Sequence, residues 1–145
     1  MTALTELLHF DRQTQALGQV SGRLGWDQET MMPSGSSAQR GEEMAALEGV
    51  LHARRSDPRV GDWLAACDGQ AYDRVTQAQL REIKTAYERA VKVPGDLAEA
   101  IASTTSMAQG KWAAARAEDD FAAFAPVLQE VLALKREEGQ ALAAG

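Results

Sequence analysis

Apolar residues recur at intervals of three or four along most of the chain, which is the spacing of one face of an α-helix. In the first segment, about 2–25, this apolar stripe consists of Leu4, Leu7, Leu8, Leu17, Val20 and Leu24. The alternation of apolar and polar residues that is typical of a β-strand never persists for more than four residues. The pattern therefore predicts an all-α fold.

Proline, glycine and serine residues interrupt the stripes and divide the chain into about six helices. The expected spans are 2–25, 36–54, 58–68, 73–92, 97–117 and 126–142. Phe121 and Phe124 are expected in a short turn before Pro126, which opens the last helix. Because the connections are short, neighbouring helices should run antiparallel, so we expect an antiparallel helical bundle or a stack of helical hairpins. The length is that of a single domain, 1–145.

Local signals indicate where several helices begin and end. Ser36 and Gln39 have the spacing of a capping box, and Asp57 followed by proline is typical of an N-cap and first turn. The glycines at 18, 22 and 25 have two interpretations: they weaken the first helix, or they let another helix approach closely. The segment 26–37, with its proline, glycine and serines, predicts a connecting loop.

Charge and composition narrow the classes of partner. The formal net charge is −6 and no five-residue basic block occurs, which argues against binding to nucleic acid or to an anionic membrane surface. No apolar run approaches the roughly 18 residues that span a bilayer, and the N-terminus lacks a signal-peptide pattern. Cys67 is the single cysteine, so no internal disulfide can form. We expect a cytoplasmic protein.

The chain is poor in groups that carry chemistry. Neither His9 nor His52 has a second ligand residue at the helical spacing that would close a metal site. Cys67 lies on an apolar helix face, which favours a small buried side chain over a nucleophile. The acidic groups, simplest to interpret as solvated or helix-start residues, are Glu42-Glu43, Glu118-Asp119-Asp120 and Glu137-Glu138. The sequence thus predicts no catalytic residue, no metal ligand and no cofactor in this chain.

One unusual cluster is the segment Trp26-Asp27-Gln28-Glu29-Thr30-Met31-Met32-Pro33, followed by Arg40. The simpler interpretation is a packed corner between helices, in which Trp26 fills the core and Asp27 or Thr30 bonds loop amides. Arg40 would then pair with Asp27 or Glu29. The alternative interpretation is a loop that faces a substrate.

A second cluster is built around Trp112 and Arg116, which lie four residues apart on one face of a predicted helix. Asp120-Phe121 and Phe124 follow shortly after. The spacing permits a cation–π contact between the tryptophan and the arginine, although core packing of Trp112 is the simpler interpretation.

Both clusters carry a resemblance to a known family. The first, Leu24 to Pro33 with Gly35 and Arg40, resembles the N-terminal signature of the carboxypeptidase Taq family of metallocarboxypeptidases. Further residues follow the same family's order: Val93-Pro94, Leu97, Trp112, Ala115-Arg116, Asp120-Phe121, Phe124 and Pro126-Val127-Leu128. The resemblance extends from about Leu4 to Leu142.

The resemblance implies a fold similar to the N-terminal part of long-cleft, all-helical zinc peptidases. A complete member would release single amino acids from the C-termini of peptides, using a divalent metal, zinc or cobalt, at an H-E-x-x-H helix. That motif is absent here, because Phe10 follows His9 and Ala53 follows His52. The resemblance therefore implies an N-terminal fragment, inactive alone, whose partner is the remainder of the parent peptidase. Members of the family tend to dimerise, so a homodimer is a further implied partner.

No catalytic residue is carried over from the family. Trp26, Asp27, Thr30, Pro33 and Arg40 match its motif, and whether they face substrate or lock the corner stays open at this point. Two other classes of function compete with this interpretation. One is a stand-alone helical protein-interaction module, and the other is a helical metal or redox protein in which Cys67 or the histidines converge.

Overall fold

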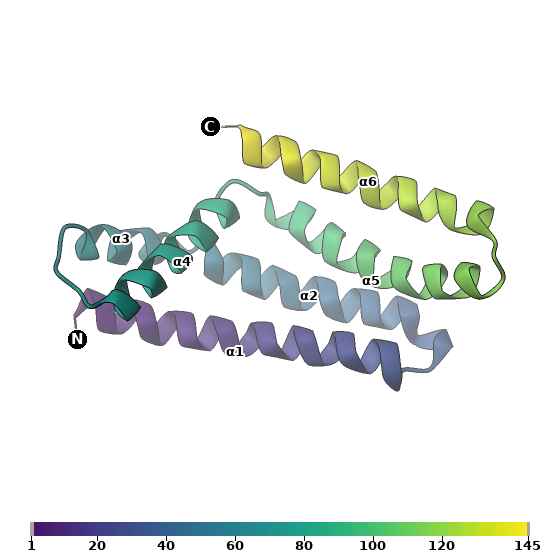
Figure 1. Cartoon of the computed structure of the whole chain (residues 1–145), viewed down its shortest axis with the longest axis horizontal. Coiled ribbons are helices and arrows are strands. Elements are labelled where there is room, and N and C mark those ends of the chain that lie inside the picture. Colours follow the sequence, from purple (N-terminus) through teal and green to yellow (C-terminus); the bar gives the residue numbers. More distant parts are fainter. Residues whose placement is uncertain (1, 145) are drawn as a thin grey trace.

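The computed structural model describes residues 2–144, and nearly all of them are helical (Figure 1). The elements are α1 Ala3–Thr30, a 3₁₀ turn η1 Ser34–Ser36, α2 Ser37–Arg55, α3 Pro58–Cys67, α4 Arg74–Ala90, α5 Gly95–Ala117 and α6 Phe121–Ala143. Residues 2–144 contain no strand. The predicted all-α fold is confirmed.

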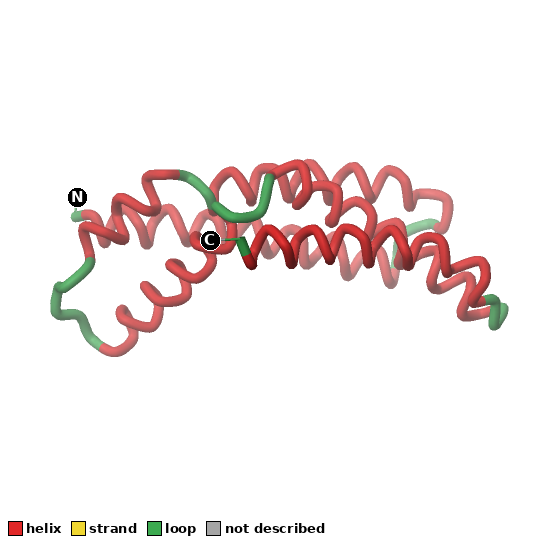
Figure 2. The backbone as a smooth tube through the Cα atoms, turned by 90° about the horizontal axis from the view of Figure 1, so that it is seen from above, coloured by secondary structure: helices red, strands yellow, loops and turns green. Residues whose placement is uncertain are grey.

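The helices α1, α2, α5 and α6 lie side by side in alternating directions (Figure 1 and Figure 2). The shorter helices α3 and α4 fold over one end of this stack, where α1 begins and α2 ends (Figure 1). We call this the α3–α4 end. At the opposite end, the α5–α6 end, α1 stops, α2 starts and α5 turns into α6. The antiparallel stack of hairpins that the short connections predicted is therefore confirmed.

The contact between α2 and α5 is the most extensive in the fold, and small residues make it close. A Cβ atom on Gly49 would lie 2.5 Å from Oε1 of Glu99, and one on Gly41 would lie 3.0 Å from Cγ of Met107. The buried residues that α5 contributes are mostly small: Leu97, Thr104, Ser106, Ala108 and Ala115. The two helices approach closely because Gly41 and Gly49 of α2 leave room for Met107 and Glu99 of α5 along this seam.

The helix α1 is longer than its sequence predicted, since it continues past Gly25 to Thr30. The expected loop at 26–30 is therefore wrong. Contacts from other helices stabilise this last turn: Gln28 exchanges hydrogen bonds with Ser106 of α5, and Arg40 of α2 bonds Asp27. These contacts offset the low helix propensity of the glycines. No atom of another element lies near the glycines at 18, 22 and 25, so the close approach considered for them does not occur.

Two local predictions at helix starts are also wrong. Asp120 caps α6 by accepting a hydrogen bond from the backbone N–H of Ala123, so Phe121 and Phe124 lie in its first turns and Pro126 lies inside the helix. Ser36 precedes α2 but makes no side-chain cap, and Gln39 bonds Glu43 and does not complete a capping box. The cap predicted at Asp57 is confirmed.

The apolar core lies at the α3–α4 end. Leu7 of α1, Val60 of α3 and Ile83 of α4 form its buried centre. Partly buried side chains pack around them: Leu8, Phe10, Trp63, Leu64, Leu80 and Tyr87. Among residues 2–144, none of the helices combines the length and apolar character that crossing a bilayer requires.

Candidate functional site

Arg40 is the centre of the first cluster, and it joins α2 to the end of α1. Its side chain is 9% exposed, and its Nη2 lies 2.5 Å from Oδ2 of Asp27. Its Nε donates to Oε2 of Glu43 at 2.9 Å, and its Nη1 donates to the carbonyl oxygen of Leu24. Of the two predicted partners of Arg40, Asp27 and Glu29, the structure pairs it with Asp27. Hydrogen bonding to Asp27 raises the pKa of Arg40 further above its ordinary value.

This cluster borders a shallow cavity of about 180 Å³. Its lining residues are Asp27, Met31, Met32, Pro33, Ser36, Gln39, Arg40 and Glu43. The structure therefore brings three of the motif residues together, namely Asp27, Pro33 and Arg40. The remaining two lie elsewhere: Thr30 donates its hydroxyl to the carbonyl oxygen of Trp26 one turn earlier, and Trp26 is 64% exposed. The expectation that Trp26 fills the core is wrong for this chain.

The sequence pattern did not predict the roles of two residues in this corner, Glu43 and Gln28. Glu43 was assigned to a solvated face, yet it is the second carboxylate on Arg40, and its three-residue spacing on one helix was the available signal. Gln28 donates to the carbonyl oxygen of Ser106 at 2.7 Å and accepts from the Ser106 hydroxyl at 2.9 Å. No local pattern connects residues so far apart in the chain.

The second cluster surrounds a cavity of about 300 Å³ at the α5–α6 end. Trp112, Ala115, Arg116, Asp119, Asp120, Phe121 and Phe124 line it. Trp112 is 49% exposed, so it is not a core residue of this chain. Arg116 does not make the cation–π contact that the spacing permits and instead pairs with Asp119 at 3.2 Å. Asp119 holds the tight turn between the helices at φ 52°, a left-handed conformation that favours glycine.

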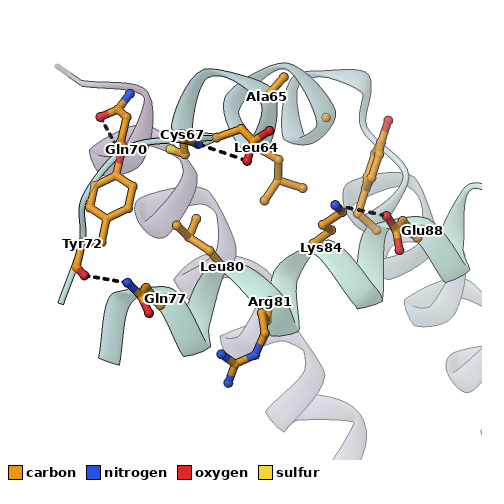
Figure 3. A pocket seen from close by; sticks show the side chains of 14 residues that line it. Leu64, Ala65, Cys67, Gln70, Tyr72, Gln77, Leu80, Arg81, Lys84 and Glu88 are labelled. Carbon is orange, nitrogen blue, oxygen red and sulfur yellow. Dashed lines mark hydrogen bonds and ion pairs between the residues drawn. The ribbon is translucent and has the colours of Figure 1, made fainter. Parts of the chain in front are cut away.

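A larger cavity, about 540 Å³, lies between α3 and α4 (Figure 3). Leu64 and Leu80 face one another across it, and Cys67 and Tyr72 lie at one side (Figure 3). Cys67 is buried, as its apolar helix face predicted. Its thiol raises the pKa of the neighbouring Tyr72 phenol. The hydroxyl of Tyr72 donates to Oε1 of Gln70, a contact that orders the loop leading into α4.

Among residues 2–144, the potential metal ligands do not form a divalent metal site. In the described part of the chain, no group of three His, Cys, Asp or Glu residues is placed to hold an ion. Nε2 of His52 lies 2.7 Å from the carbonyl oxygen of Val93, and Nε2 of His9 lies 3.3 Å from the side chain of Gln13. Both imidazoles therefore have structural partners, and neither shares a site with Cys67.

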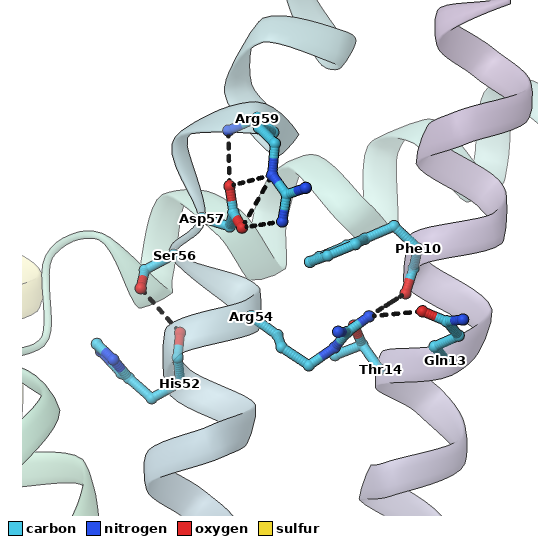
Figure 4. A network of polar contacts seen from close by, with 8 residues as sticks. All are labelled: Phe10, Gln13, Thr14, His52, Arg54, Ser56, Asp57 and Arg59. Carbon is cyan, nitrogen blue, oxygen red and sulfur yellow. Dashed lines mark hydrogen bonds and ion pairs between the residues drawn. The ribbon is translucent and has the colours of Figure 1, made fainter. Parts of the chain in front are cut away.

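A polar network fastens α2 and α3 to α1 near the core (Figure 4). The Arg54 guanidinium lies 4.0 Å from the centre of the Phe10 ring and donates to the Phe10 carbonyl oxygen and to the Thr14 hydroxyl. Beside it, Asp57 accepts hydrogen bonds from the Arg59 side chain, which lower the pKa of Asp57. These contacts join α2 and α3 to α1.

The sequence pattern of one metallopeptidase family, carboxypeptidase Taq (M32), matches residues 6–145. Thermostable carboxypeptidase 1 of Thermus thermophilus is 39% identical over 144 residues, which cover 97% of this chain and 28% of that protein. Thermostable carboxypeptidase 1 of Pyrococcus furiosus is 24% identical over 140 residues, which cover 96% of this chain and 28% of that protein.

Solved structures agree with these relatives. Metallocarboxypeptidase 1 of Trypanosoma cruzi superposes with a TM-score of 0.71 at 31% identity, covering 99% of this chain and 29% of that one. A Pyrococcus furiosus carboxypeptidase superposes with a TM-score of 0.72 at 23% identity, covering 97% and 29%, and supports the fold. The class is that of the metallocarboxypeptidases, and the chain belongs to the carboxypeptidase Taq (M32) metallopeptidase family. It spans 28% of the length of the two thermostable carboxypeptidases.

Proposed function

We propose that this chain is the N-terminal helical region of a metal-dependent carboxypeptidase that releases C-terminal amino acids from peptides. The observation that carries the proposal is the family match over residues 6–145, combined with the coverage of 28% of each thermostable carboxypeptidase. The match covers nearly the whole of this chain but less than a third of each relative, as expected for one region of a longer peptidase.

We propose further that the chain alone does not hydrolyse peptides, and that zinc or cobalt is held by the rest of the peptidase. Hydrolysis by a bound metal needs several ligands and an open coordination position for water. Supporting the proposal, His9 and His52 are engaged by Gln13 and by the Val93 carbonyl. The role of this chain would then be structural: the Arg40 corner and the α2–α5 seam would hold its helices in place beside the catalytic part of the peptidase.

The test compares the chain with a chimera in which it replaces the matched 28% of the Thermus thermophilus relative. Each protein is incubated with zinc or cobalt and with two peptides that differ only in a free or an amidated C-terminus. We expect the chain to release no amino acid, and the chimera to release one from the free peptide alone. Hydrolysis by the isolated chain, or a chimera that folds and cleaves neither peptide, contradicts the proposal.

A further inference from the structure

The exposed aromatic side chains of this chain gather at one end. Trp26, Trp112 and Phe121 are 64%, 49% and 68% exposed. Trp26 lies near the end of α1, Trp112 near the end of α5 and Phe121 at the start of α6, all toward the same end of the stack (Figure 1). Of the three, Trp112 and Phe121 line one cavity. Aromatic residues exposed together in this way are typical of the buried centre of an interface.

The α5–α6 end is also shaped to receive a side chain. The cavity of about 300 Å³ lies between Trp112 and Ala115 on α5 and Phe121 and Phe124 on α6. The left-handed turn at Asp119 sets the two helices so that these side chains line a common hollow.

The rim of the hollow is acidic. Glu118, Asp119 and Asp120 follow one another in the turn, all exposed, and Arg116 pairs with Asp119. A segment that covers the hollow therefore meets an apolar centre that is bordered, at the turn, by Asp119, Asp120 and the paired Arg116, with Glu118 next to them in the chain. Complementary chemistry is an apolar side chain on a segment that carries lysine or arginine beside it.

We propose that the α5–α6 end is the face through which this chain binds the rest of the peptidase, by receiving an apolar segment with basic flanks. The inference rests on the proposed function, because the occupant is the part of the peptidase beyond the 28% that this chain matches. At the α3–α4 end, in contrast, Phe10, Trp63 and Tyr87 already pack against Leu7, Val60 and Ile83.

The test measures how fast a maleimide labels single introduced cysteines, in the isolated chain and in the chimera described above. Phe121→Cys and Trp112→Cys report on the two sides of the hollow, and each leaves the other aromatic residue in place. Val75→Cys is the matched control, since Val75 is also 68% exposed but lies on α4. Peptide mapping by mass spectrometry assigns the labelled site, and the buried Cys67 reports on folding.

We expect all three cysteines to react rapidly in the isolated chain. In the chimera, the cysteines at 121 and 112 should react at least roughly tenfold more slowly while the one at 75 stays reactive, because a docked segment must open before labelling. Equal rates at 121 and 75 in the chimera overturn the proposal, whether both react or both are protected. Glu118→Lys should restore labelling at 121 in part, and Glu137→Lys, away from the hollow, should not.

Activity separates this inference from the proposed function. A chimera that cleaves the free peptide while its cysteine at 121 stays reactive retains the proposed function and refutes the docking face. A chimera that protects the cysteine at 121 and cleaves no peptide retains the docking face and refutes the function.

Discussion

The two ends of the helical stack contain similar residue types and close in different ways. At the α3–α4 end, Phe10 and Trp63 pack with ring centres 5.6 Å apart over a buried apolar centre. At the α5–α6 end, Trp112 and Phe121 border an open hollow, and the contacts that order the corner are polar ones around Arg40.

The difference shows that the type of a side chain does not decide whether it is buried. Tryptophan and phenylalanine gain from burial wherever they occur, but another element must be available to cover them. The helices α3 and α4 supply that cover at one end (Figure 1). No element among residues 2–144 supplies it at the other, so the same apolar character that stabilises one end leaves a binding surface at the opposite end.

The largest expected effect comes from shortening a core side chain at the α3–α4 end. Leu7→Ala should lower the free energy of unfolding by about 3 kcal/mol, because it leaves a cavity where the side chain is completely buried. Phe121→Ala should change it by less than about 0.5 kcal/mol in the isolated chain, because most of that ring is already in water. Urea unfolding followed by circular dichroism measures both. Similar losses for the two variants would abolish the contrast between the ends.

The next effect concerns the polar corner. Arg40→Ala should destabilise the chain by about 2 kcal/mol, since it removes a buried guanidinium with three acceptors. The loss stays below that of a fully buried ion pair because Asp27 and Glu43 are 40% and 39% exposed and regain water.

Two variants are controls for the corner in the same urea measurement. Arg116→Ala removes an exposed ion pair and should cost no more than about 0.5 kcal/mol. Arg40→Lys should lose most of the stability that Arg40→Ala loses, because a single ammonium group cannot reproduce the planar fork. A lysine variant as stable as the native chain would show that charge alone holds the corner.

A smaller effect is expected at the left-handed turn. Asp119→Gly should be more stable than Asp119→Ala by about 1 kcal/mol, because alanine resists a positive φ and glycine does not. Gly139 lies near the C-terminal end of α6 and has open space for a Cβ atom. At that position alanine should be more stable than glycine, which is the opposite sign. Thermal unfolding of the three variants tests the pair of signs. Alanine equal to glycine at 119 would mean that the turn relaxes out of this conformation.

The smallest effect is a pH dependence of the stability at the α3–α4 end, where Asp57 caps α3 and Asp73 caps α4. Hydrogen bonds from the Arg59 side chain lower the pKa of Asp57, and those from the Thr76 side chain lower the pKa of Asp73. An unfolded aspartate has a pKa of about 3.9. The stability that these carboxylates contribute is therefore present above about pH 3.9 and lost as the pH falls through their lower folded pKa values.

Asp57→Asn and Asp73→Asn retain a cap oxygen and remove the titration, so together they should flatten the fall in melting temperature below about pH 4. Asp62→Asn is the control, since Asp62 lies on α3 and caps no helix. Melting temperatures from pH 7 to pH 2 check the slopes. An unchanged slope in the double variant would assign the acid sensitivity to other carboxylates.

Much of the fold was predictable because its determinants are local. The apolar stripes and the aspartate at 57 give helices whose ends fall close to those expected, and Cys67 is buried as its neighbours indicated. The end of α1 was not predictable, since the glycines weaken a helix that Arg40 and Ser106 stabilise from other elements.

The candidate site was predictable only in part. The sequence predicted that Arg40 pairs with Asp27 or Glu29, and the structure has the pair with Asp27 together with Glu43, which was not predicted. The exposure of Trp26 and Trp112 could not be predicted from the sequence. A hydrophobic side chain favours burial, but its type does not determine which element, if any, covers it.

The seam of small residues between α2 and α5 joins opposite halves of the chain, whereas each hairpin on either side of it joins neighbours in sequence. Contacts between neighbours in sequence form quickly, and contacts between distant segments carry the larger loss of chain entropy. We therefore expect the α1–α2 and α5–α6 hairpins to form first and their docking along the seam to limit the rate of folding. A larger side chain at Gly49 would then require Glu99 to move aside as the two halves come together.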